Sequence, residues 1–103
     1  MKYVLTWTNR LRGSAAENVV AAETTLKLLA NWQPNPDVTI HQWVIRCDGS
    51  GGFSVLETEN AAALYKDLAV WSTLLDFQLF PVLDIGDATP LLGEATDIAR
   101  SVV

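Results

Sequence analysis

The stretch VTIHQWVIRCDGSGGFSVLETEN, residues 38–60, decides the fold, because two runs of β-forming residues flank a glycine-rich turn. Glycines within DGSGG (48–52) supply the positive φ angles that tight hairpin turns require. The stretch therefore predicts two consecutive antiparallel strands. A two-stranded hairpin is not stable by itself, so we expect the segments on either side to complete the sheet.

The segment before the hairpin predicts a strand followed by a helix. KYVLTWT (2–8) is rich in β-forming residues and predicts the strand. Ser14 and Glu17 have the spacing of a capping box that opens the helix, and the prolines of QPNPD (33–37) end it. Apolar residues at helical spacing predict the buried stripe of this helix: Ala15, Val19, Ala22, Leu26 and Leu29.

The segment after the hairpin repeats this alternation. Asn60 can cap a second helix, and DFQLFPVLDI (76–85) predicts a fourth strand, in which Pro81 favours the edge of the sheet. TPLLGEATDIARSVV (89–103) predicts a terminal helix that Thr89 caps and Pro90 opens. The inner stripe of the second helix is predicted to comprise Ala61, Leu64, Leu68, Trp71 and Leu75.

The order β-α-β-β-α-β with a terminal helix predicts an α+β, ferredoxin-like fold with a four-stranded antiparallel sheet. Residues 1–88 form the domain, and residues 89–103 are a helical extension of it. Two helices cover one face of such a sheet and leave the other face bare. Because large apolar faces are rarely left open in soluble proteins, we expect a face-to-face homodimer, whose two sheets can close around a shared or paired cavity.

The composition excludes several classes of function. The chain has 103 residues, half of them hydrophobic, which suits one packed domain. The net charge of −5, with scattered basic residues, argues against nucleic-acid and anionic-membrane partners. Neither a signal peptide nor a long apolar run is recognisable, so we expect a cytoplasmic protein.

Metal and cofactor sites are not expected either. The chain has one histidine, His41, and one cysteine, Cys47, so it lacks the usual ligand clusters and any internal disulfide. No phosphate-binding loop, nucleophile elbow or dinucleotide fingerprint occurs. We therefore predict no metal and no cofactor.

The pairing of the hairpin suggests where a ligand would lie. If the turn is symmetric about Ser50, Trp43 faces Glu57, and His41 lies on the same side of the sheet. The opposite side, with Ile40, Val44 and Leu56, would then meet the helices. Odd-numbered residues of the first strand, among them Leu5, would join the mixed side, where the predicted ligand-binding residues are Tyr3, Trp7, His41, Trp43 and Glu57.

His41 and Glu57 are the candidate catalytic residues. The pKa of histidine lies near neutrality, which suits proton transfer, and burial could raise the pKa of Glu57 enough to make it a general base. Structural roles are open for both: His41 as a hydrogen-bonded surface residue, and Glu57 as a partner of the Trp43 indole or of an arginine on a second chain. Of the four tryptophans (Trp7, Trp32, Trp43 and Trp71), at most two are expected to touch a ligand.

The segment GGFSVLETENAAALYKDLAVWSTLLDFQLFPVLDIGDA, together with the opening KYVLTW, resembles the bacterial domain of unknown function 3303 family. Glu57, Trp71, the pair Asp76-Phe77 and the pair Pro81-Val82 stand in the places of that family's motifs. The resemblance runs from Lys2 to about Ala88, with the RCDGSGG turn and the helical tail as additions. It implies a ferredoxin-like domain of the dimeric α+β-barrel kind and no established activity.

The wider superfamily that this resemblance implies includes cofactor-independent oxygenases, isomerases, haem-degrading enzymes and ligand sensors. Its haem-degrading members use an Asn, a Trp and a helical His, and here Asn9 and Trp71 are present but His41 is on a predicted strand. Two hypotheses remain open. The first is a dimer that binds a small apolar molecule, with proton-transfer or oxygenase-type chemistry in it. The second is a non-catalytic interaction or ligand-sensing module whose mixed sheet face is a dimer interface.

Overall fold

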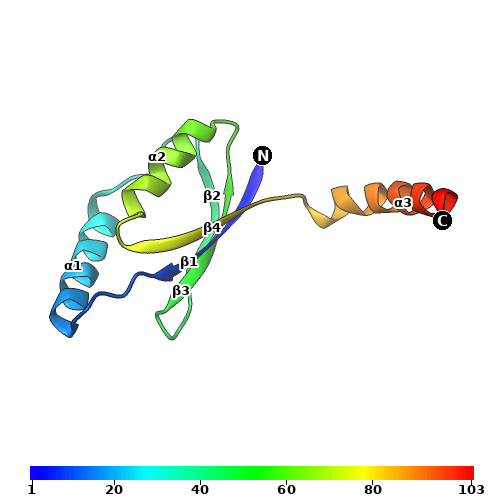
Figure 1. The fold of residues 1–103 in the computed structure, drawn as a ribbon. Helices are drawn as coiled ribbons and strands as arrows, with labels where there is room; N and C mark the ends of the chain where they lie inside the picture. Colours follow the sequence, from blue (N-terminus) through cyan, green and yellow to red (C-terminus); the bar gives the residue numbers. More distant parts are fainter.

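The computed structural model describes all residues from 1 to 103. Seven elements follow one another along the chain (Figure 1): β1 (Lys2–Asn9), α1 (Ala15–Asn31), β2 (Thr39–Ile45), β3 (Gly51–Glu57), α2 (Ala61–Trp71), β4 (Leu75–Val82) and α3 (Ile85–Val102). This order confirms the predicted α+β, ferredoxin-like arrangement. None of the three helices is both long enough and apolar enough to cross a membrane.

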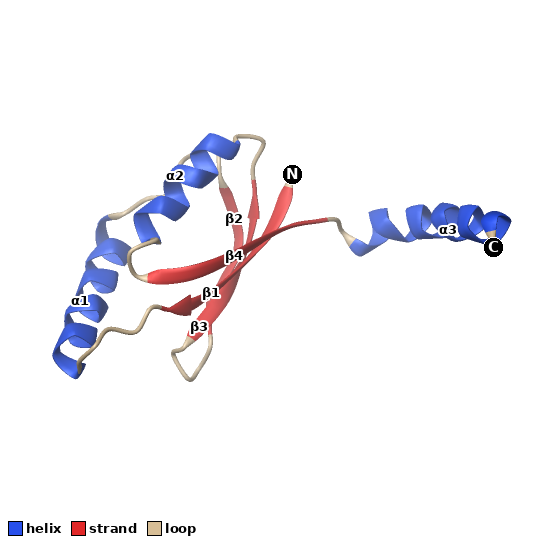
Figure 2. Ribbon diagram, viewed as in Figure 1, coloured by secondary structure: helices blue, strands red, loops and turns tan.

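The four strands form one antiparallel sheet in the order β2-β3-β1-β4. β4 is an edge strand, as Pro81 predicted, since proline cannot donate a hydrogen bond to a further neighbour. α1 and α2 lie on the same side of the sheet (Figure 2). We call this side the helix face and the uncovered side the open face.

The predicted register of the β2–β3 hairpin is wrong. Trp43 pairs with Ser54 rather than with Glu57, and the register shifts between Ile40 and Gln42, which places a β-bulge at His41. The turn also lies earlier than predicted. Only Gly49 has a positive φ, of 73°, and the Arg46 amide donates to the Gly51 carbonyl over 2.8 Å.

The observed register separates residues that we expected on one face. Leu56 packs with Leu64 of α2, so its partner in β1, Tyr3, belongs to the helix face, as does Leu5. Trp7 follows from the same alternation along β1, and Trp43 contacts the tryptophan of α2. His41 and Glu57 instead lie on the open face. The bulge explains the split, because one extra residue in β2 reverses the side on which the following residues point.

α2 packs on the sheet largely as its sequence predicts. Asn60 caps the helix, accepting a hydrogen bond from the Ala63 amide over 3.1 Å, and Leu64, Leu68 and Trp71 face inward. Ala61 is exposed, contrary to the prediction, and Leu75 lies in β4. The buried core is small and centres on Leu5, Leu56 and Leu64.

α1 stands off from the sheet. Ser14 caps it as predicted, accepting from the Glu17 amide over 3.2 Å. However, the predicted buried stripe is wrong, because α1 contains no buried residue and Val19, Leu26 and Leu29 are exposed. The half-buried positions are Asn18, Ala21, Thr25 and Leu28. Asn18 Oδ1 accepts a hydrogen bond from the Arg12 amide over 2.7 Å, which fixes the rotation of the helix about its axis.

α3 begins at Ile85, four residues before the predicted start. The Thr89 hydroxyl donates to the Ile85 carbonyl over 2.7 Å, so Thr89 lies inside the helix and does not cap it. Pro90 is also internal, and its missing N–H leaves only the Gly86 carbonyl without a helical donor. α3 contains no buried residue and projects away from the sheet (Figure 1).

Candidate functional site

A groove of about 680 Å3 lies between α1 and the helix face of the sheet. α1 contributes one wall, β2 the other, and the ends of β1 and β4 close one end. Twelve of the sixteen residues that line it are hydrophobic. The lining comprises Trp7, Asn9, Arg10, Leu11, Asn18, Ala21, Ala22, Thr25, Leu26, Leu29, Trp43, Val44, Ile45, Trp71, Leu74 and Leu75. Its size and apolar lining are those of a small-molecule site.

Three indoles form a cluster, and two of them, Trp43 and Trp71, line the groove. Trp32, Trp43 and Trp71 contact one another edge to face, with centroids 5.6–6.5 Å apart. Edge-to-face contacts of this length are favourable, because the positive edge of one ring meets the negative face of the next. Trp71, the last residue of α2, is buried and joins the cluster to that helix. Trp43 is partly exposed and lines the groove.

A second, smaller space of about 50 Å3 adjoins the groove and reaches into the core. Trp7, Trp43, Trp71 and Leu75 line both spaces, so they form the boundary between them. The deeper space is about the size of one or two water molecules. The groove itself is therefore the only one of the two that could hold a larger molecule.

The one charged side chain in the groove already has a partner. Arg10 donates two hydrogen bonds to Asp76 Oδ1, over 2.8 and 3.1 Å. Asn9 likewise donates to the Gly49 carbonyl over 2.5 Å. Because these polar groups are engaged within the chain, the groove offers little attraction to an anion and favours a neutral, apolar occupant.

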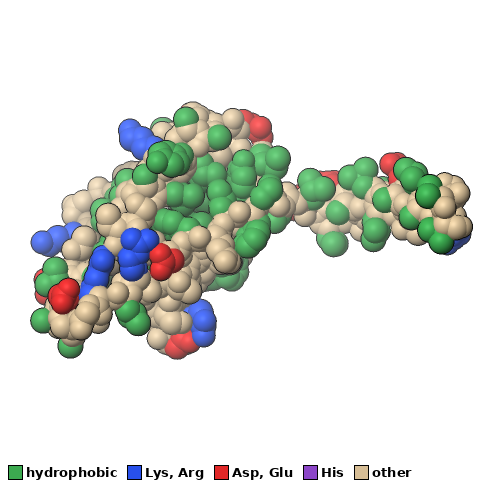
Figure 3. Space-filling model, viewed as in Figure 1, with side chains coloured by type: hydrophobic (Ala, Val, Ile, Leu, Met, Phe, Trp, Pro, Cys, Tyr) green, Lys and Arg blue, Asp and Glu red, His purple; other side chains and the backbone are tan.

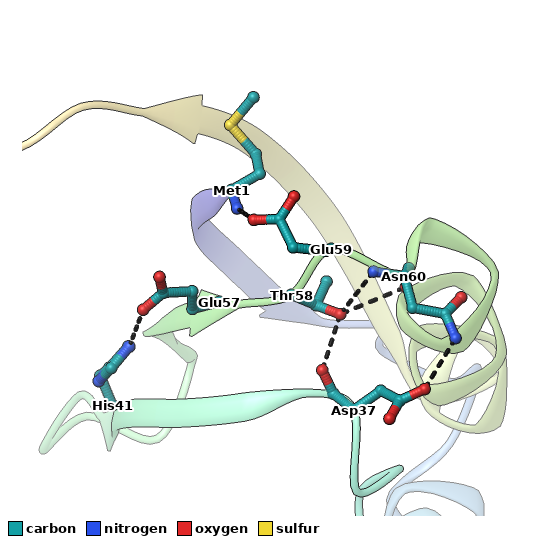
Figure 4. Close-up of polar contacts among 7 residues, drawn as sticks. All are labelled: Met1, Asp37, His41, Glu57, Thr58, Glu59 and Asn60. Atoms are coloured by element: carbon teal, nitrogen blue, oxygen red, sulfur yellow. Dashed lines mark hydrogen bonds and ion pairs between the residues drawn. The ribbon is translucent and has the colours of Figure 1, made fainter.

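His41 and Glu57 form a pair on the open face, away from the groove. His41 Nε2 lies 2.7 Å from Glu57 Oε1, and the two side chains are 43% and 48% exposed (Figure 4). The hydrogen bond from His41 lowers the pKa of Glu57 below its ordinary value. The prediction that burial raises this pKa is therefore wrong, and so is the predicted bond from Glu57 to the Trp43 indole, because the two lie on opposite faces.

The residues next to this pair hold the end of the hairpin in place. Buried Thr58 donates from its hydroxyl to the Asp37 carbonyl over 2.8 Å and accepts from the Asn60 amide over 3.0 Å (Figure 4). Glu59 pairs with the amino group of Met1. These contacts tie the start of β2, the end of β3 and the start of α2 together, so they have a structural role.

The five predicted ligand-binding residues therefore divide into two sets. Trp7 and Trp43 line the groove, and Tyr3 lies farther along the helix face, beside the core. His41 and Glu57 lie on the open face. Sequence reasoning missed the α1 wall of the groove. Leu26 and Leu29 were predicted to be buried, whereas they are exposed and line this wall.

The open face is the second surface of functional interest. Val44, Phe53 and Phe80 are exposed on it, and Val4 and Val55 pair with each other at its centre. No group of three or more His, Cys, Asp or Glu side chains gathers anywhere in the structure. Cys47 is a free, exposed thiol at the hairpin turn.

A protein-family model described as "Domain of unknown function (DUF3303)" matches residues 1–96. The match continues past Ala88, where the resemblance was predicted to end, and includes the first two-thirds of α3. No curated protein matches the chain.

Proposed function

The chain belongs to the DUF3303 family, whose description names no activity, and on that premise we propose that it binds a small, largely apolar molecule in the groove between α1 and the sheet. The observation that carries this proposal is the groove itself. It measures about 680 Å3, twelve of its sixteen lining residues are hydrophobic, and its single charge is neutralised by Asp76. These are the properties of a pocket for a neutral ligand.

The proposed binding is not catalytic. A general base works best when its pKa lies near the operating pH, whereas the pKa of Glu57 is lowered by its hydrogen bond with His41. Neither residue of the pair lines the groove, so neither would reach a molecule bound there. The groove thus favours a ligand-sensing or carrier role over proton-transfer or oxygenase chemistry. The cytoplasm stays the predicted compartment.

The proposal can be tested with the apolar dye Nile red and the substitution Ala22→Leu. Ala22 lies on the α1 wall of the groove, and a larger side chain there narrows it without weakening the helix, because leucine is a good helix former. We expect wild-type protein to enhance the emission of the dye, and Ala22→Leu to raise the dissociation constant by about tenfold or more.

Ala30→Leu is the matched control, since Ala30 is exposed on the same helix and does not line the groove. It should bind the dye as wild type does. Energy transfer from tryptophan gives a second readout, because Trp7, Trp43 and Trp71 line the groove. Equal affinities for Ala22→Leu and Ala30→Leu would place the dye elsewhere and refute the groove as the binding site.

A second candidate function is pairing of two copies of the chain through the open face. The open face carries exposed Phe53, Phe80 and Val44 in one continuous sheet, which favours burial against the same face of a second copy. In such a homodimer, the His41–Glu57 pair would lie within the interface.

Phe80→Arg tests this pairing, because it places a charge on the open face at a position that is 48% exposed in the single chain. We expect light scattering after size exclusion to give about twice 11.3 kDa for wild type and a single-chain mass for Phe80→Arg. Tyr65→Arg, on the outer surface of α2, is the control and should stay dimeric. A single-chain mass for wild type, or a dimeric Phe80→Arg, would refute the interface.

A further inference from the structure

α3 is amphipathic, yet none of its residues is buried. Its apolar residues recur at spacings of three and four, so they form one stripe along the whole helix: Ala88, Leu91, Leu92, Ala95, Ile98, Ala99 and Val102. Its charged residues lie off this stripe: Asp87, Glu94, Asp97 and Arg100. Leu92 and Ile98 are 68% and 66% exposed. A helix with such a stripe derives most of its stability from a surface on which the stripe packs.

The size of the molecule shows how much surface lacks a partner. A compact protein of 11.3 kDa exposes about 5,700 Å2, whereas this chain exposes 7401 Å2. The radius of gyration is 18.1 Å, against about 13 Å for a compact domain of this length. The excess area exceeds the roughly 800 Å2 that each partner buries in a standard protein–protein interface. The chain therefore carries enough surplus surface for a stable dimer.

The connection between β4 and α3 is short. Only Leu83 and Asp84 separate the two elements, and Lys2 of β1 holds Asp84 with an ion pair of 2.8 Å. This hydrogen bond raises the pKa of Lys2. In Figures 1 and 3, α3 points away from α1 and α2, with apolar side chains along it and a further apolar area between α2 and β4.

From these observations we infer that α3 is an exchanged arm, whose apolar stripe packs on the body of a second copy of this chain. Its length of about 27 Å is close to that of the eight-residue strands, about 26 Å, so one arm is long enough to run along the whole body of the other copy. In a symmetric pair both arms are satisfied at once. The inference rests on the proposed pairing of two copies and is independent of ligand binding.

Two lysine substitutions on α3 test the arm. Ile98→Lys places a charge on the stripe, and Ser101→Lys places the same charge off it, one turn away. Lysine is a good helix former, so α3 persists in both variants. We expect sedimentation equilibrium to show that Ile98→Lys raises the dimer dissociation constant by about tenfold or more, while Ser101→Lys changes it by less than about twofold.

The other outcomes are decisive as well. If both lysine variants dimerise as wild type does, while Phe80→Arg does not, the open face pairs the copies without the arm and the inference fails alone. A wild-type monomer whose radius of gyration in solution is near 13 Å would mean that α3 folds back on its own chain. A wild-type monomer that keeps a radius near 18.1 Å would overturn both the arm and the dimer.

Discussion

At the residue scale, the most consequential position is His41, because the bulge there decides which side chains meet. It turns Trp43 toward the tryptophan cluster while leaving His41 itself beside Glu57 on the open face. A bulge inserts one residue into one strand, so its effect is to re-aim every side chain that follows. Here it separates an aromatic site from an ionisable pair by the thickness of a single sheet.

The lowered pKa of Glu57 predicts a pH dependence. A carboxyl whose pKa is lower in the folded state than its ordinary 4.5 adds stability above that value and loses it as pH falls through the folded pKa. We therefore expect Glu57→Gln to weaken the fall in unfolding free energy below about pH 4.5. Urea titrations at a series of pH values measure this.

Glu94→Gln serves as the control, because it removes the same charge from the polar side of α3, where no hydrogen bond or ion pair engages it. Its acid profile should follow that of wild type. Should Glu57→Gln retain the full acid dependence, the bond between His41 and Glu57 does not persist in solution.

Residue chemistry also sets the limit of what the sequence predicts. The caps at Ser14 and Asn60 are local, and both were predicted correctly. The bulge at His41 was not, since no residue type marks it and the pairing of distant residues decides it. The buried Asp67 was missed too, although a carboxylate between Leu64 and Trp71 on an apolar stripe was a usable sign. It accepts hydrogen bonds from the Asn35 amide over 2.9 and 3.2 Å.

At the scale of elements, close contact between β1 and β3 depends on Gly51, where a Cβ would overlap the Trp7 carbonyl, and on Gly52. A Cβ at Gly52 would lie 2.5 Å from Cζ2 of Trp7 and would also overlap the Val44 carbonyl. Trp7 can lie flat over β3 only because that position has no side chain. The glycines of DGSGG thus serve the packing of the tryptophan at the groove as much as the turn.

Gly52→Ala is accordingly expected to lower the free energy of unfolding by about 1–3 kcal/mol, through overpacking, and to shift tryptophan fluorescence. Gly93→Ala in α3 should do the opposite. Nothing lies near its Cβ position, so alanine should stabilise the helix by about 0.5–1 kcal/mol and raise its helicity. Circular dichroism and denaturant titration distinguish the two, and an unchanged Gly52→Ala would mean that Trp7 is not seated as described.

The type and order of the elements were predicted correctly. The errors concern which side of α1 faces the sheet and where α3 starts. α1 was expected to bury Val19 and Leu26, yet these residues are exposed, because Arg12 and Asn18 fix the other side of the helix toward the sheet. α3 was expected to start at Thr89, but it starts at Ile85, about one turn earlier. Periodicity locates a stripe but does not identify the surface that it meets.

At the scale of the whole molecule, the chain buries few residues for its size. Only 12 of 103 are buried, and the central cluster contains three. If two copies pair as proposed, so small a core predicts that folding and pairing are coupled.

Coupled folding predicts a melting temperature that depends on concentration. For two chains with an unfolding enthalpy of about 140 kcal/mol, each tenfold increase in protein concentration should raise the melting temperature by about 3 °C. Differential scanning calorimetry over two decades of concentration measures this. The Phe80→Arg variant should show no such dependence, and a constant wild-type melting temperature would contradict the coupling.

The two borders of the sheet have a consequence for aggregation. β2 is interrupted by the bulge at His41, and β4 carries Pro81 near its end, so each outer strand lacks an unbroken row of backbone donors and acceptors. An unfolded or foreign strand therefore finds no regular template along which to extend the sheet. The protein can therefore expose broad apolar surfaces while resisting the strand-by-strand growth that leads to fibrils.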